Sequence, residues 1–185
     1  EADRLVGVAL DAGINFFDTA DSYADGDSER ILGKALGARR RDIVLASKVR
    51  SRVGPGPNQV GLSRAHIVAS VDASLRRLGT DWLDLYQIHG YDAATPLDET
   101  MRALDDLVRA GKIRYIGLSN FRAYRLAAVT MLCRQMGVPQ PIALQPYYNA
   151  MDRVAEVEVL PAAEYFGLGV VSYSPLSRGV LTGKY

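Results

Sequence analysis

Short apolar runs alternate along the chain with longer segments in which apolar residues recur at helical spacing. The first helical segment contains Leu5, Val6, Val8 and Leu10 and ends at Gly13, a residue type that commonly terminates helices. An apolar run follows, and the two kinds of segment then repeat to the end of the chain. The pattern predicts strands at residues 14–19, 43–48, 83–89, 113–119, 142–145 and 169–173, and further helices at 28–36, 63–78, 96–110, 123–136 and 157–166.

The predicted strands are continuously apolar, which is typical of strands covered by helices on both faces of a parallel sheet. Polar residues follow at the carboxyl ends of all six strands: Asp18, Lys48, His89, Ser119 with Asn120, Gln145, and Tyr173 with Ser174. An open sheet gathers its ligand-binding groups at one switch point, whereas a barrel directs every strand end toward one axis. The pattern therefore favours a (β/α)8 TIM barrel of the α/β class over an open doubly wound sheet.

The composition narrows the functional classes. With 185 residues, 48% hydrophobic and 23% charged, the chain can bury the core of one ordinary domain. A net charge of +1, from 22 basic and 21 acidic residues, argues against a nucleic-acid partner. No apolar run approaches the roughly 18 residues of a membrane span, and no signal peptide opens the chain. A single cysteine, Cys133, excludes an internal disulfide framework, and we expect a cytoplasmic protein without a metal site.

The ends of the first three predicted strands carry the candidate chemistry. An acid, a phenol, an amine and an imidazole occur there as Asp18, Tyr23, Lys48 and His89. Together these groups suggest a site for proton transfer. The alternative is that all four are ordinary residues at strand ends, but a buried lysine without a function is uncommon.

Six ordered segments of the chain resemble the aldo-keto reductase superfamily. They extend over residues 1–185 and read GINFFDTADSYADGDSERILGKAL, LASK, LDLYQIHG, GKIRYIGLSNF, LQPYYN and YSPLSRGVLTGKY. The last segment is most similar to the branch that includes bacterial general reductases and potassium-channel beta subunits. Single pieces such as Ser119-Asn120 are weak signals, whereas six matches in order are specific.

The resemblance implies an oxidoreductase that uses NADPH (NADP+) to reduce an aldehyde, ketone or sugar-derived carbonyl. Tyr23 would be the general acid that protonates the carbonyl oxygen. Lys48 would place a cation beside the phenol and favour its ionised form, and Asp18 would hold the ammonium by a salt bridge. His89 would orient the carbonyl oxygen for hydride transfer.

The resemblance also implies a set of cofactor-binding residues. Ser119, Asn120 and Gln145 would hold the nicotinamide carboxamide, and Tyr173 would stack on the nicotinamide ring. The segment that starts at Ser174 would wrap the pyrophosphate with backbone N–H groups. The full set is Asp18, Ser119, Asn120, Gln145, Tyr173, Ser174, Pro175, Leu176, Ser177, Arg178, Gly179 and Lys184. Alternatively, Tyr173 is a core aromatic residue and Lys184 an exposed lysine.

The predicted barrel departs from the family in its number of strands. A closed barrel of this kind has eight strands, and the chain contains about six, so we expect a single domain over 1–185 that is incomplete at both ends. The family's contacts to the adenosine 2'-phosphate lie mainly in the final units, so the residues present do not decide between NADPH and NADH. A second chain that completes the barrel remains an alternative, and the oligomeric state is open.

Two functional classes follow from the resemblance. The first is a carbonyl reductase with a small-molecule substrate of undefined identity. The second is a cofactor-binding regulatory or interaction protein with little turnover, as in the channel beta subunits. Steady turnover of carbonyl compounds would indicate the first class, and cofactor binding without turnover the second.

Three other expectations concern residues outside the candidate site. His66 lies in a predicted helix at a position expected to be exposed. The basic run Arg39-Arg40-Arg41 is expected in a solvated loop. Cys133, without a neighbouring histidine or basic cluster, is expected to be a buried apolar thiol.

Overall fold

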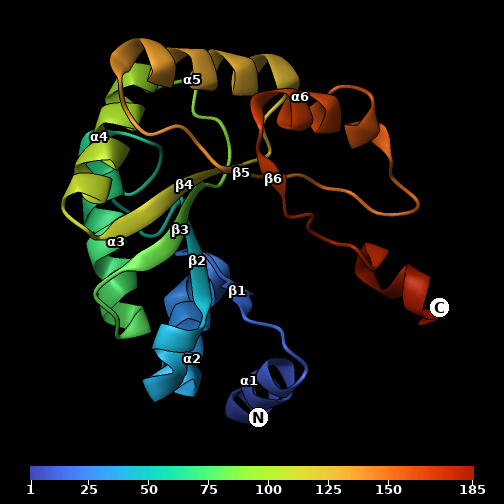
Figure 1. Ribbon diagram of the computed structural model, residues 1–185. Coiled ribbons are helices and arrows are strands. Elements are labelled where there is room, and N and C mark those ends of the chain that lie inside the picture. Colours follow the sequence, from blue (N-terminus) through green and yellow to red (C-terminus); the bar gives the residue numbers. More distant parts are fainter.

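Six parallel strands form one continuous sheet in the computed structural model, which describes residues 1–185. They are adjacent in chain order, so each strand pairs only with its sequence neighbours. The sheet curls into an open half-barrel whose concave side faces away from most of the helices (Figure 1). The strands are β1 Phe16–Asp18, β2 Val44–Val49, β3 Leu83–Ile88, β4 Ile113–Ser119, β5 Ala143–Gln145 and β6 Gly169–Val170.

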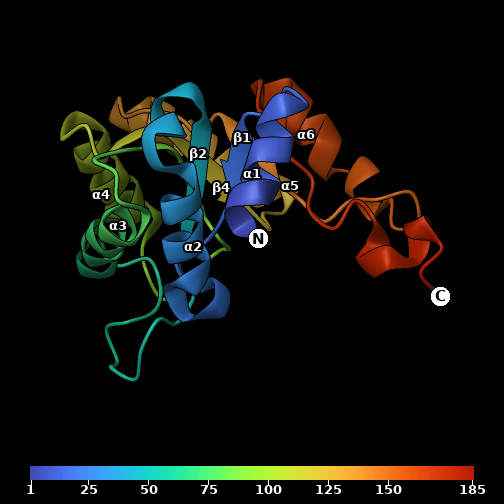
Figure 2. The same cartoon turned by 90° about the horizontal axis from the view of Figure 1, so that it is seen from below.

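A helix lies between each pair of successive strands, on the convex side of the sheet, and Figure 2 shows this outer layer from below. The α-helices are α1 Ala2–Asp11, α2 Asp27–Leu36, α3 Arg64–Leu78, α4 Leu97–Arg109, α5 Ala123–Met136 and α6 Val159–Phe166. Short 3-10 segments occur at η1 Tyr23–Gly26, η2 Gly37–Asp42, η3 Val154–Glu156 and η4 Ser177–Thr182. The architecture is that of a partial (β/α)8 barrel, as the alternation of apolar segments predicts.

Local sequence signals explain where α3 begins and ends. The side chain of Ser63 caps its start by accepting a hydrogen bond from the His66 N–H at 3.3 Å. Gly79 ends the helix in the left-handed conformation, with φ of 65°. Gly33 of α2 lets the two helices approach closely, because a Cβ there would lie 2.4 Å from the Leu78 carbonyl oxygen.

The main hydrophobic core lies between the sheet and the helices. It includes Leu45, Tyr86 and Ile116 from the strands and Ile67 and Leu104 from the helices, each 1% exposed or less. A separate small cluster, Ala46, Leu85 and Ala143, lies on the opposite face of the same strands. Since successive residues of a strand point to opposite faces, the concave face is built from the alternate positions.

Four sequence-based expectations need correction, and the first two concern the bounds of elements. The final strand ends at Val170 instead of residue 173, and only an isolated bridge joins Tyr147 to Tyr173. Pro146 in the neighbouring segment has no N–H to donate, which interrupts the ladder. The helix predicted at 157–166 begins at Val159 and follows a 3-10 turn.

The other two corrections concern burial. His66 is 3% exposed, contrary to the expectation, and its ring lies beside Ser70 and the Ser51 backbone in the segment that follows β2. This burial lowers the pKa of His66. The prediction for Cys133 is confirmed, because the thiol is free and buried.

Arg40 is also buried, whereas the basic run was expected to be solvated. Its guanidinium lies 4.5 Å above the Trp82 ring, donates to the Trp82 carbonyl oxygen at 2.8 Å and pairs with Asp84 at 2.9 Å. The hydrophobic and charge pattern could not reveal this contact, because Trp82 and Asp84 come from a segment that is distant along the chain.

Candidate active site

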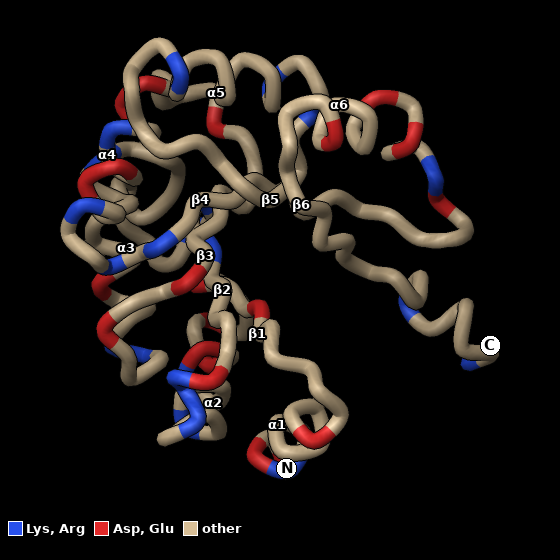
Figure 3. The backbone as a smooth tube through the Cα atoms, in the orientation of Figure 1, with Lys and Arg blue, Asp and Glu red and all other residues tan.

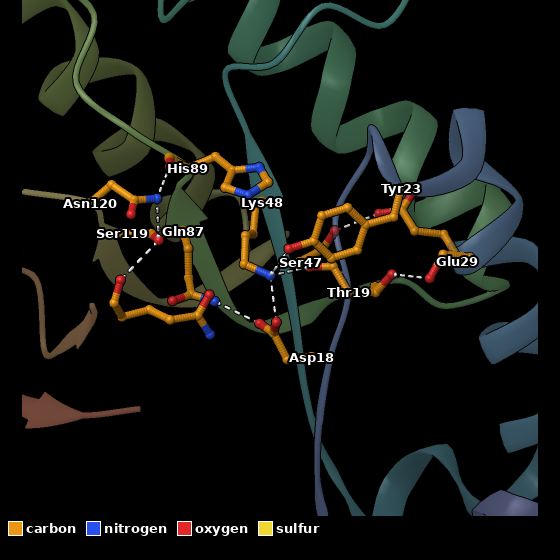
Figure 4. Close-up of polar contacts among 12 residues, drawn as sticks. Asp18, Thr19, Tyr23, Glu29, Ser47, Lys48, Gln87, His89, Ser119 and Asn120 are labelled. Atoms are coloured by element: carbon orange, nitrogen blue, oxygen red, sulfur yellow. Dashed lines mark hydrogen bonds and ion pairs between the residues drawn. The ribbon is translucent and has the colours of Figure 1, made fainter. Parts of the chain in front are cut away.

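The Lys48 ammonium is the centre of the candidate site. Lys48 lies on the concave face of β2, two residues after Ala46, and is completely buried. The ammonium forms an ion pair with Asp18 at the end of β1 and donates to the Thr19 carbonyl oxygen at 2.8 Å. It also lies 3.3 Å from the Tyr23 hydroxyl oxygen (Figure 4). The cation is therefore held by three oxygen atoms, one of them the phenol.

A second hydrogen bond fixes the Asp18 carboxylate. The Gln87 side-chain amide donates to Asp18 Oδ1 at 2.8 Å. Lys48 and Gln87 are register partners across β2 and β3, and Gln87 is the partner of Gly117 across β3 and β4. A Cβ at Gly117 would lie 2.9 Å from the Gln87 side chain, so glycine leaves the room that this amide occupies. The sequence analysis assigned no role to Gln87, although its register position next to Lys48 was a usable signal.

The rings of Tyr23 and His89 contact each other at the candidate site. Their ring centroids are 5.6 Å apart in an edge-to-face arrangement. Tyr23 is 41% exposed and begins η1, in which Ala24 and Asp25 adopt left-handed backbone conformations. Such conformations are costly for non-glycine residues and persist only where the surrounding structure holds them.

His89 is a neutral imidazole at physiological pH. Burial, followed by the positive charge of Lys48, lowers the pKa of His89 to about 4. Its Nδ1 atom is buried without a hydrogen-bond partner. A neutral imidazole carries one N–H, so His89 can donate a hydrogen bond without carrying a charge.

The residues expected at the carboxamide form a connected group. Ser119 Oγ donates to the Gln145 carbonyl oxygen at 3.0 Å, and the Asn120 amide donates to Ser119 Oγ at 3.1 Å and to the His89 carbonyl oxygen at 3.0 Å. The Tyr173 hydroxyl donates to Asn120 Oδ1 at 2.9 Å. Asn120 adopts a left-handed conformation, with φ of 58°. These bonds link the ends of β3, β4 and β5 to the segment after β6.

The segment after β6 turns sharply. Ser174, Ser177, Arg178 and Gly179 all have positive φ values. The N–H groups of Ser177 and Gly179 donate within the segment, to the carbonyl oxygens of Ser174 and Leu176, at 3.0 Å each. The Asn149 amide donates to the Ser174 carbonyl oxygen at 3.3 Å and ties the segment to the region after β5.

Not every predicted residue lies at the Lys48 cluster. Lys184 is exposed, and its ammonium lies 5.6 Å from the ring of Tyr185. Figure 1 shows this C-terminal region projecting away from the ends of β1–β4. The same outlying segment contains Pro175, Leu176 and Arg178, and all three are exposed.

Comparison with known proteins identifies the family of the chain. The sequence model of the Aldo/keto reductase family matches residues 1–185. The chain belongs to this family. None of its helices is long and apolar enough to cross a membrane.

Named relatives of the chain include both enzymes and channel subunits. It is 42% identical to a probable voltage-gated potassium channel subunit beta of Oryza sativa subsp. japonica, over 100% of this chain and 57% of the relative. It is 43% identical to the uncharacterized oxidoreductase YrpG of Bacillus subtilis, over 99% of this chain and 60% of the relative. It is 39% identical to versiconal hemiacetal acetate reductase of Aspergillus parasiticus, over 98% of this chain and 58% of the relative. The chain thus spans less than two thirds of the length of these relatives.

A buried polar cluster lies behind β2 and was missed in the sequence analysis. The Ser47 hydroxyl donates to Glu29, which is completely buried and pairs with Arg77 at 2.6 Å. Asp21 is 2% exposed, and neither of its carboxylate oxygens accepts a hydrogen bond. Burial, followed by the Glu29 carboxylate, raises the pKa of Asp21 to about 7. Only the packing of α2 and α3 against β2 brings these groups together.

Proposed function

We propose that the chain reduces the carbonyl group of an aldehyde, ketone or sugar-derived compound to an alcohol, with NADPH as hydride donor and Tyr23 as general acid. Membership of the aldo/keto reductase family supports an oxidoreductase in general. The observation that carries the finer proposal is the placement of the Tyr23 hydroxyl 3.3 Å from the buried Lys48 ammonium.

Tyr23 transfers its proton to the substrate oxygen in this proposal. A phenol is a weak acid at neutral pH, and loss of its proton leaves a phenolate. The Lys48 ammonium stabilises that anion through a charge-assisted hydrogen bond. Asp18 and the Thr19 carbonyl oxygen keep the ammonium in position, so the charge is already in place when the proton leaves.

His89 orients the substrate. Its neutral ring lies edge-to-face with Tyr23, so a carbonyl oxygen near the phenol is also within reach of the imidazole. A neutral donor fixes the direction of the carbonyl without adding a second cation beside Lys48.

The residues present fit the nicotinamide end of the cofactor, which supplies the hydride when bound. Gln145 is nearly buried, and its side-chain amide forms no hydrogen bond within the chain. The Gln145 amide offers both a donor and an acceptor for a carboxamide, and the side-chain oxygens of Ser119 and Asn120 can accept one further hydrogen bond each. Tyr173 is 37% exposed and presents an aromatic surface for stacking. We propose that residues 174–179 and Lys184 bind the phosphate groups.

A specific observation favours a second candidate function. Relatives named as potassium channel beta subunits are 42% identical to the whole of this chain. A cofactor-binding regulatory or interaction protein could use the same residues with negligible turnover.

The single free cysteine fits a reducing compartment, and we propose a cytoplasmic location.

The test is NADPH oxidation with a panel of aldehydes and ketones, alongside direct titration of NADPH and NADH. We expect Tyr23→Phe to lower kcat by roughly 10²- to 10⁴-fold, because the acid is lost, while cofactor affinity changes little. Tyr165→Phe is the matched control, since Tyr165 is an 83% exposed residue of α6 that belongs to neither the Lys48 cluster nor the proposed cofactor site. Cofactor binding without turnover would support the regulatory function, and unchanged turnover in Tyr23→Phe would exclude the proposed mechanism.

A further inference from the structure

Arg50 lies at the rim of the candidate active site, immediately after β2. Its side chain runs along the backbone of the residue next to His89: a Cβ at Gly90 would lie 3.7 Å from both Arg50 Cδ and Arg50 Nε. The Arg50 Nε atom donates to the Tyr91 carbonyl oxygen at 3.2 Å. The positive charge of Arg50 also contributes to the lowered pKa of His89. The Arg50 side chain therefore lies beside the residue that follows His89, and its charge acts on the His89 ring.

The backbone of Arg50 adopts an energetically unfavourable conformation. Its φ of 135° lies in the region that normally only glycine adopts. The Arg50 carbonyl oxygen accepts a hydrogen bond from the Gly61 N–H at 2.9 Å, which anchors the unusual conformation. Such strain is often found where a side chain must be held for binding or catalysis.

The two terminal nitrogen atoms of Arg50 have no partner within the chain. No carboxylate lies within ion-pair distance of them, and Nε alone is engaged. The nearby Asp92 carboxylate is occupied by the N–H groups of Leu62 and Ala94, at 2.8 and 2.9 Å, and by the Thr95 hydroxyl at 2.8 Å. The guanidinium thus offers free donors in a fixed orientation.

A second guanidinium strengthens the positive charge at this part of the rim. The Arg125 guanidinium carbon lies 3.7 Å from the centre of the Tyr91 ring. Tyr91 is therefore contacted by Arg50 through its carbonyl oxygen and by Arg125 through its ring. Two guanidinium groups that contact one residue favour a ligand with negative charge.

We propose that Arg50 binds the carboxylate of the substrate, so that the preferred substrates are carbonyl compounds that carry a carboxylate group. The proposal rests on the proposed reductase function and names its substrate class. The planar fork of arginine matches the two oxygens of a carboxylate. With Nε held by Tyr91, the free nitrogens would bind the carboxylate while Tyr23 and His89 contact the carbonyl oxygen.

The test compares two aldehydes of similar size, 4-carboxybenzaldehyde and its neutral methyl ester, methyl 4-formylbenzoate. In the unmodified chain we expect kcat/KM to be at least 10-fold higher for the acid. Arg50→Met keeps the apolar stem and should lower kcat/KM for the acid by roughly 10- to 100-fold, mainly through KM, because one charge-assisted contact is lost. The value for the ester should change less than about twofold.

Two further variants keep the test decisive. Arg52→Met is the matched control, because the Arg52 guanidinium donates to the carbonyl oxygens of Gly54 and Gly56 on the same loop, and it should leave the acid preference intact. Arg50→Lys keeps the charge and should restore part of the preference. Equal kinetics for acid and ester in the unmodified chain, or an equal loss for both in Arg50→Met, would overturn the proposal while the reductase function stands.

A binding measurement separates this proposal from the reductase function. Calorimetric titration of the chain with 4-carboxybenzaldehyde and with the ester requires no turnover. Tighter binding of the acid, lost in Arg50→Met and kept in Arg52→Met, would support the Arg50 site even if neither aldehyde is reduced. Equal binding of acid and ester would overturn it.

Discussion

Asp21 is a buried carboxyl group without a hydrogen-bond partner, two residues before Tyr23. Burial and the Glu29 carboxylate raise its pKa to about 7 in the folded chain, from an ordinary value of 3.8. Between these pH values the unfolded chain is ionised at this position and the folded chain is protonated. The free energy of unfolding should therefore fall as the pH rises from 4 to 7.

We predict that Asp21→Asn removes this pH dependence. The contribution is on the order of 4 kcal/mol at most, since one pKa unit corresponds to about 1.4 kcal/mol. Urea unfolding at pH 5 and pH 8 would measure it, with Asp25→Asn as an exposed control in the same turn. Equal loss of stability between the two pH values in Asp21→Asn and in the unmodified chain would contradict the prediction.

The titration of His89 is a second prediction at the scale of single residues. Because burial and Lys48 lower the pKa of His89 to about 4, its ring should remain neutral from pH 5 upward. The charge of Arg50 acts in the same direction, so Arg50→Met should raise the pKa. Nuclear magnetic resonance of the two histidine rings over a range of pH would measure the pKa of His89. The variant His66→Gln would show which signals belong to His89. A His89 pKa near 6.5 in the unmodified chain would show that its ring is not buried as described.

The packing of α2 on α3 depends on a glycine within a helix. A Cβ at Gly33 would meet the backbone of Leu78 at 2.4 Å, so the helices would have to separate. We predict that Gly33→Ala destabilises the chain by about 1–3 kcal/mol. Gly7→Ala in α1 is the matched control, because its Cβ would meet only an Arg39 side-chain atom at 3.8 Å.

The control variant should instead gain stability. Alanine is favoured over glycine within helices by about 0.5–1 kcal/mol. Opposite changes in the midpoint of thermal unfolding would therefore separate helix propensity from helix packing. Stabilisation by both variants would show that α2 can shift to admit a methyl group.

At the scale of elements, the periodic pattern predicted most helices and strands within a few residues. The long amphipathic helices α3, α4 and α5 agree closely, since each carries a repeated apolar stripe. The errors occur where a neighbouring element decides the outcome. β6 ends early beside Pro146, and Arg40 is buried because its guanidinium lies over Trp82.

The whole molecule has two sheet edges, at β1 and β6, each paired on one side only. Exposed strand edges are templates for pairing with another chain. Charged residues of both signs are interspersed over the helices, so no large field of one sign keeps copies apart (Figure 3). We expect the 185-residue chain to self-associate as its concentration rises.

A lysine at the edge should weaken this association. Val170 of β6 is 43% exposed, and Val170→Lys would place a charge at the free edge. Met131→Lys on α5, where Met131 is 54% exposed, is the control for a charge added away from the edge. Sedimentation velocity over a range of concentrations would measure the effect. Equal association of both variants would indicate contacts through another surface.

The candidate site was largely predictable because its residues occupy the ends of successive strands. Asp18, Lys48 and His89 could be placed together from the rule that parallel strands end at one face. Gln87 was missed because its role depends on register, which sets it beside Lys48 and against Gly117. Asp21 was missed because its sequence position does not reveal that helices exclude water from it.

The sequence by itself determined the order of elements, the parallel half-barrel and the polar strand ends, because periodicity and chain order are local properties. Only the tertiary structure decided which polar groups are buried and which partners they meet. The ion pair of Glu29 with Arg77, the orphaned carboxyl of Asp21 and the position of the Arg50 guanidinium all depend on contacts between segments distant along the chain. Burial and electrostatic coupling arise from those contacts, and no pattern along one segment contains them.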